Sequence, residues 1–118
     1  MIVEDNAIQA LSLEMFIKQL GFNQVRKTHS AKDAMEIVES FSPELMLVDI
    51  NLNSEITGID IVKKAQELGD VNVIYISGNS DNLHKESASD TEFISYLIKP
   101  VEFDSLRELL SNKQILPK

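Results

Sequence analysis

The chain has 118 residues, of which 43% are apolar, and this size and composition indicate one compact domain with a single modest core. Nineteen acidic residues against eleven lysines and arginines give a formal charge of -8, which argues against direct binding to nucleic acid or to anionic membranes. The absence of cysteine excludes disulfides and thiol catalysis and, with no apolar run of transmembrane length and no signal-peptide pattern, favours a cytoplasmic protein.

Short apolar segments rich in β-branched residues alternate with segments of helical period, a pattern typical of successive βαβ units. We therefore expect an α/β fold with a doubly wound parallel sheet of five strands and with five helices. The predicted strands cover residues 1–3, 25–28, 45–48, 73–76 and 95–98. Acidic residues follow the first strand after only three apolar ones, so either this strand is short or the chain is trimmed.

The first helix is predicted over residues 7–20, with Gly21 as its stop. Its apolar residues should form a wide stripe facing the core, namely Ile8, Leu11 and Met15, widened by Leu13, Phe16, Ile17 and Leu20. Capping signals with the spacing of Ser30 and Asp33 precede the second helix, and Thr57 and Asp60 repeat them before the third. The residues expected to face inward from these two helices are Ala34, Met35, Val38 and Phe41, then Ile59, Val62, Ala65 and Leu68.

The last two predicted helices differ in their apolar content. Residues 81–89 offer only Leu83 and Ala88 as apolar anchors, which predicts a poorly packed fourth helix. The fifth helix, over residues 103–110, carries Phe103, Leu106, Leu109 and Leu110. No repeat or linker interrupts the chain, so we expect residues 1–118 to form one domain.

Polar side chains follow four of the predicted strands, at the sheet edge where doubly wound folds bind their ligands. Glu4 and Asp5 follow the first strand, Asp49 the third, Ser77 the fourth and Lys99 the fifth. Clustered carboxylates share a proton or recruit a cation, and oxygen ligands without His or Cys favour Mg²⁺. Lys99 and Ser77 suit a phosphate group. The pattern predicts phosphoryl transfer to an Asp49 oxygen.

Each of these residues also has an ordinary explanation when it is taken alone. Acidic pairs at strand ends are commonly solvated, Asp49 could cap a turn, Ser77 could bond a neighbouring backbone group, and Lys99 could reach water. The joint pattern, with each group after a different strand, favours the functional interpretation. His29 and His84 are not placed to bind a metal with these carboxylates, and we interpret both as ordinary surface or strand-end residues.

These strand-end segments resemble the receiver domain of bacterial two-component response regulators, and the likeness spans essentially the whole chain. The matching segments are 2–6 (IVEDN), 47–52 (LVDINL), 57–60 (TGID), 76–78 (ISG) and 96–100 (YLIKP). The resemblance implies a flavodoxin-like fold with strand order 2-1-3-4-5. It also implies that Asp49 is phosphorylated from a histidine of a sensor kinase or phosphotransfer protein. Such a domain is a signalling phosphoacceptor rather than an enzyme, although it assists its own phosphorylation and dephosphorylation.

By the same resemblance, Mg²⁺ would be held by Asp49, by Asp5 directly, by Glu4 through water and by the backbone carbonyl of Asn51. Ser77 and Tyr96 match the switch pair of the family, in which the hydroxyl moves to the phosphate and the aromatic ring turns inward. The alternative for Tyr96 is a half-buried strand aromatic.

Backbone features of the family also have counterparts in this chain. The Lys99-Pro100 bond matches one that is cis in the family and would aim the lysine. Gly58 matches a position at the start of the third helix, and Gly78 would keep the phosphate approach open. Asn53 replaces a common proline in a longer polar loop, and Asn51 and Asn79 lie where the family tunes dephosphorylation.

Other functions on similar folds conflict with particular residues. A haloacid-dehalogenase enzyme requires a second Asp where Asn51 stands, and a flavin carrier would have its phosphate repelled by Glu4 and Asp5. A degenerate receiver that binds partners without phosphorylation stays open.

The chain is either a stand-alone receiver or one excised from a longer protein, which the short first strand favours. A partner would contact the face of the fourth helix, fifth strand and fifth helix, and a phosphorylation-linked dimer stays open.

Overall fold

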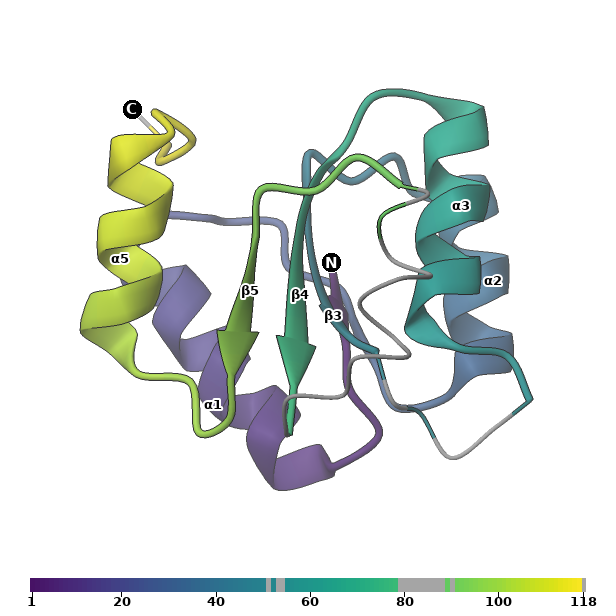
Figure 1. The fold of residues 1–118 in the computed structure, drawn as a ribbon, viewed down its shortest axis with the longest axis horizontal. Coiled ribbons are helices and arrows are strands. Elements are labelled where there is room, and N and C mark those ends of the chain that lie inside the picture. The colour runs from purple at the N-terminus through teal and green to yellow at the C-terminus, as the bar shows by residue number, and fades with distance from the viewer. Residues whose placement is uncertain (51, 53–54, 79–88, 90, 118) are drawn as a thin grey trace.

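In the computed structural model, which describes residues 1–50, 52, 55–78, 89 and 91–117, five parallel strands form one sheet (Figure 1). The strands are β1 (Ile2–Val3), β2 (Lys27–Thr28), β3 (Leu45–Asp49), β4 (Asn72–Ser77) and β5 (Ser95–Ile98). Their order is β2-β1-β3-β4-β5, which confirms the predicted fold class and strand order. The second strand is shorter than predicted because its partner β1 offers only Ile2 and Val3 for pairing.

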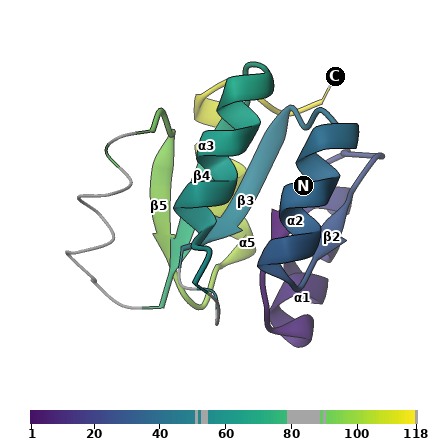
Figure 2. The ribbon, with the colours of Figure 1, turned by 90° about the vertical axis from the view of Figure 1, so that its right-hand side faces the viewer.

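Helices cover both faces of this sheet. One face carries α1 (Ala7–Gln19) and α5 (Phe103–Asn112), and the other carries α2 (Ala31–Ser40) and α3 (Gly58–Leu68) (Figures 1 and 2). The part of the chain with described placement therefore has four helices where five were predicted. Apart from Ser89, the predicted fourth helix lies outside the described residues.

Strands β3 and β4 are buried on both faces, as their nearly continuous apolar sequences predict. Alternate side chains of β3 and β4 enter two separate apolar clusters. Met46, Val48, Val73 and Tyr75 face α2 and α3. Leu45, Leu47, Ile74 and Ile76 face α1 and α5. This double cover places the carboxyl ends of both strands at one edge of a rigid layer.

The predicted capping signals are present at the N-termini of two helices. The Ser30 side chain accepts a hydrogen bond from the Asp33 backbone N–H at 3.2 Å. At α3 the capping box is complete, because Thr57 accepts from the Asp60 N–H while the Asp60 carboxylate accepts from the Thr57 N–H. Such caps each stabilise a helix by about 1 kcal/mol. The start of α3, which borders the candidate site, is thus held locally.

The predicted core-facing stripe of α1 is wrong in part. Its buried face consists of Ala10, Leu13 and Ile17. The exposed fractions of Ile8, Leu11 and Met15 are 78%, 48% and 58%. The helix is apolar on nearly every side, so its periodicity could not identify which face meets the sheet. Leu68 is also exposed rather than inward-facing, because it lies in the last turn of α3.

Candidate functional site

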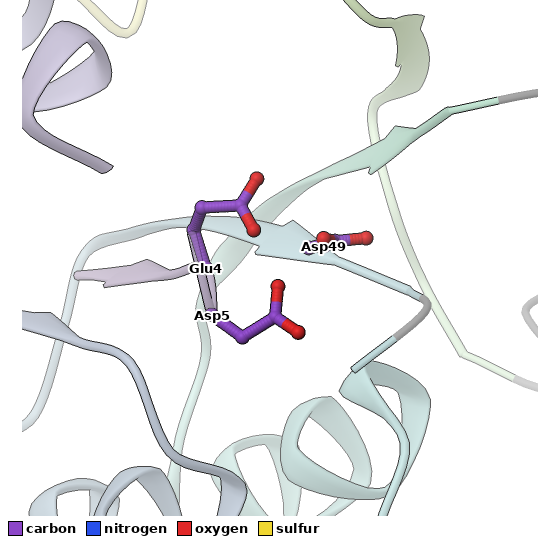
Figure 3. Close-up of side chains that lie close together, drawn as sticks. All are labelled: Glu4, Asp5 and Asp49. Carbon is purple, nitrogen blue, oxygen red and sulfur yellow. The ribbon is translucent and has the colours of Figure 1, made fainter. Parts of the chain in front are cut away.

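Three carboxylates meet at the carboxyl edge of the sheet (Figure 3). Glu4 and Asp5 directly follow β1, and Asp49 is the last residue of the neighbouring strand β3. One oxygen from each carboxylate lies within 4.8 Å of the others. Glu4 and Asp49 are almost fully buried, with exposed fractions of 1% and 3%, whereas Asp5 is half-buried. The structure therefore brings together the acidic residues that were singled out from the sequence.

Lys99 lies between two of these carboxylates. Its Nζ donates a hydrogen bond to Asp49 Oδ2 at 2.8 Å and forms an ion pair with Glu4 Oε1 at 2.7 Å. The contact with Glu4 is not aligned as a hydrogen bond, and Oε1 accepts none from the described residues. The other oxygen, Oε2, accepts one from the Asn6 backbone N–H at 3.2 Å. The sequence predicted that Lys99 would reach this edge but not that it would pair with Glu4.

Burial and mutual contact shift the pKa values of Glu4 and Lys99. Burial raises the pKa of Glu4 to about 7; Lys99 opposes that rise, and the nearby Asp49 carboxylate adds to it. Burial lowers the pKa of Lys99, but its contacts with Asp49 and Glu4 outweigh burial and leave that pKa raised. Lys99 is therefore positively charged at neutral pH, whereas Glu4, with a pKa of about 7, is readily protonated.

The residues present fit a divalent cation. When all three carboxylates are ionised, Lys99 balances one charge and leaves two, the charge of one Mg²⁺. The donors are all oxygens, which suits a hard cation, and the buried Glu4 Oε1 accepts no hydrogen bond from described residues. Asn51, whose carbonyl was expected to complete the set, lies outside the described residues.

Gly58 explains how α3 can begin directly behind Asp49. Its N–H donates to the Ile50 carbonyl at 3.2 Å. A Cβ atom on Gly58 would lie 2.6 Å from Val48 Cγ1, 3.1 Å from the carbonyl carbon of Asp49, and closer still to the Asp49 carbonyl oxygen. Only glycine permits this approach without displacement. A Cβ on Gly78, by contrast, would contact no described atom.

The predicted switch residues, Ser77 and Tyr96, lie on β4 and β5, on the side of β3 away from β1. Ser77 ends β4, and its carbonyl accepts the Lys99 backbone N–H at 2.9 Å. Tyr96 pairs in register with Tyr75, two residues before Ser77, so Tyr96 and Ser77 belong to the same face of the sheet. The Lys99-Pro100 peptide bond is cis, as expected.

The remaining predictions have different outcomes. His29 is exposed, and its Nδ1 donates to the backbone carbonyl of Glu4 at 3.1 Å, so it is not directed at the carboxylates as a ligand. Asn53, Asn79 and His84 lie outside the described residues. Tyr75 was not predicted as a site residue, although a tyrosine within a buried aliphatic strand signals a hydroxyl that needs a partner.

The sequence profile of the response regulator receiver domain matches residues 1–111. The chain belongs to this receiver family. It is 32% identical over 109 residues to the TorCAD operon transcriptional regulatory protein TorR of Escherichia coli K12, covering 92% of this chain and 45% of TorR. The receiver domain thus spans about half the length of the curated relatives it matches.

Solved structures agree with this assignment. A CheY-like response regulator receiver domain from Methylobacillus flagellatus matches with a TM-score of 0.78 and 28% identity, over 94% of this chain and 93% of that one. The receiver domain of a sensor histidine kinase from Pseudomonas aeruginosa PAO1 matches with a TM-score of 0.77 and 21% identity, over 94% and 92% of the two chains. That structure holds magnesium in its active site cleft, but at this identity the likeness shows the fold alone.

The receiver domain therefore belongs to two-component signalling. Among its described helices, none combines the length and the apolar character needed to cross a bilayer. The cytoplasmic location stays a prediction.

Proposed function

We propose that Asp49 accepts a phosphoryl group, with Mg²⁺, from a histidine of a sensor kinase or phosphotransfer protein. The observation that carries this proposal is the buried Asp49 carboxylate, which Lys99 contacts at 2.8 Å within a cluster of three acids. A carboxylate that only ended a strand would not need a partly buried lysine beside it. Residues 1–118 would act together as one receiver domain.

The chemistry follows from the two oxygens of Asp49. Lys99 contacts Oδ2 at 2.8 Å, and one oxygen of the Asp49 carboxylate would attack phosphorus. As the new O–P bond forms, the bond from phosphorus to the donor imidazole nitrogen breaks and its electron pair goes to that nitrogen, so that a ring protonated on its other nitrogen leaves as neutral imidazole. Lys99 stabilises the negative charge on the transferring group.

Asp5, Asp49 and Glu4 would hold the metal, with the Asn51 carbonyl as the further ligand expected from the family resemblance. When bound, Mg²⁺ would supply positive charge beside the phosphoryl oxygens. Because Glu4 already contacts Lys99, its role through water is compatible with the observed ion pair. Glu4 would thus contact Lys99 directly and the metal ion through a water molecule.

The signal would leave the site through Ser77 and Tyr96. The Ser77 hydroxyl would move to the phosphoryl group, and the Tyr96 ring would turn inward behind it. A partner or a second receiver domain would then contact the face that includes β5 and α5, where Ile98 has an exposed fraction of 56%.

Intact-mass measurement tests the proposal directly. The purified domain is incubated with Mg²⁺ and acetyl phosphate as small phosphodonor, and we expect the addition of one phosphoryl group. Asp49→Asn keeps the size of the side chain but removes the nucleophile, so it should not be labelled. Asp104→Asn is the matched control because Asp104 is exposed on α5, and it should be labelled like the parent.

Two results would contradict the proposal in different ways. Labelling of Asp49→Asn equal to that of the parent would show that another residue accepts the phosphoryl group. No labelling of the parent with acetyl phosphate or with a phosphorylated histidine protein would instead favour a degenerate receiver.

A further inference from the structure

Tyr75 is a buried tyrosine in the middle of β4, and its hydroxyl has a defined partner. The side chain is fully buried, and its Oη lies 2.6 Å from Oγ1 of Thr91, whose exposed fraction is 7%. Burial raises the pKa of Tyr75 to about 12, because the buried site disfavours the charged phenolate. A buried hydroxyl pair of this kind fixes both side chains, because breaking it leaves polar groups without water.

The segment that carries Thr91 is itself held against the sheet. The Ile94 backbone N–H donates to the Val73 carbonyl at 2.7 Å, which joins the start of β5 to β4. Gln66 of α3 donates from its side chain to the Glu92 carbonyl, also at 2.7 Å. Thr91 is therefore a fixed anchor for the Tyr75 hydroxyl rather than part of a loose connection.

The Tyr75 ring forms the surface on which Tyr96 lies. The two rings are stacked, with centroids 5.9 Å apart and an angle of 28° between their planes. The Phe93 ring packs against both, with its centroid 5.3 Å from that of Tyr75 and 4.8 Å from that of Tyr96. Tyr96 cannot turn to another orientation without losing contacts with one or both of these rings.

We propose that Tyr75, fixed by Thr91, is a positioning residue that holds the Tyr96 ring in the orientation of the unphosphorylated domain. This inference rests on the proposed function, in which Tyr96 reorients when Asp49 is phosphorylated. The ring contacts and the anchored hydroxyl favour one of the two orientations. Their strength therefore sets the fraction of molecules already switched before phosphorylation.

The chain has only two tyrosines and no tryptophan, so each tyrosine can be observed separately. Fluorine NMR of the domain labelled with 3-fluorotyrosine should give one resonance for Tyr75 and one for Tyr96, and Tyr96→Phe assigns them. The informative variants are Thr91→Val, which removes one hydroxyl at constant shape, and Tyr75→Phe, which removes the other.

In both variants, without phosphodonor, we expect the Tyr96 resonance to move toward its position in the phosphorylated parent. Loss of the hydrogen bond between the Tyr75 and Thr91 hydroxyls should increase the fraction of molecules with Tyr96 reoriented, and the rate of labelling by acetyl phosphate, about fivefold. The double variant should differ little from either single one, because both remove the same bond. Thr28→Val is the matched control, since Thr28 is also buried and donates to the Ser30 carbonyl at the other side of the sheet.

The inference is wrong if the Tyr96 resonance of folded Thr91→Val and Tyr75→Phe coincides with that of the parent, or moves equally in Thr28→Val. Urea unfolding and the amide spectrum establish that each variant is folded. A parent that gains no phosphoryl group would refute the proposed function instead, while the donor-free resonance still decides whether Tyr75 positions the ring.

Discussion

Adding one methyl group at Gly58 tests how rigidly α3 is fixed against the end of β3. The new Cβ would lie 2.6 Å from Val48 Cγ1, whereas ordinary contacts begin at about 3.4 Å. Relief requires a shift of roughly 1 Å, and the carbonyl group of Asp49 on the other side is backbone that cannot rotate away.

The cost of Gly58→Ala can be worked from these contacts. Overpacking of this kind costs about 3 kcal/mol at the upper end of its range, and strain in the hydrogen bond to Ile50 adds about 1 kcal/mol. The higher helix propensity of alanine offsets up to about 1 kcal/mol. We therefore expect a net loss of about 3 kcal/mol in the free energy of unfolding, or about 10–15 °C in Tm.

Urea unfolding of the parent, Gly58→Ala and Gly69→Ala provides the assay. Gly69 is the control because it lies at the other end of α3, no described atom is within 4 Å of its added Cβ, and its φ of 166° is extended. Gly69→Ala should change stability by less than about 1 kcal/mol. Equal unfolding midpoints for the two variants would show that α3 can shift to accommodate the added methyl group at little cost in stability, and would refute the prediction.

Three further predictions concern single contacts. Lys99→Met leaves two buried carboxylates without their cation, so Mg²⁺ should raise its Tm more than that of the parent; an equal rise in a thermal-shift assay would contradict the ion-pair assignment. The pKa of Tyr75 is raised from 10 to about 12, so between about pH 10 and 12 the unfolded chain loses this proton first. Stability that is complete below pH 10 should therefore fall by up to about 3 kcal/mol, and Tyr75→Phe should lack this component in urea titrations across that range. On α1, Leu13→Ala should cost about 2–5 kcal/mol and Leu11→Ala less than about 1 kcal/mol in urea unfolding, and equal costs would contradict the observed buried face.

The strand ends were predictable because a parallel sheet brings the residues after each strand to one edge. Asp49 and Lys99 lie 50 positions apart in the sequence and meet at this edge because each follows a strand. The capping residues were predictable for a similar reason, since the signal and its hydrogen bond are separated by only three positions.

Features that depend on which surfaces pack together in the fold were harder to predict from the sequence. The buried face of α1 is decided by the shape of the sheet and of α5, and Ala10 marks it with only one methyl group. The two-residue length of β2 is decided by its partner strand. The contact between Tyr75 and Thr91 depends on the path of the chain before β5, which no local pattern encodes.

The ion pair between Lys99 and Glu4 depends on the length of the acidic side chain at position 4. Aspartate at position 4 would shorten the side chain by one methylene and withdraw its carboxylate from a cation only 2.7 Å away. Lys99 would then interact mainly with Asp49, and the hydrogen bond to Asn6 would have to be remade. The length of the acid at position 4 therefore determines how the positive charge of Lys99 is shared between Glu4 and Asp49.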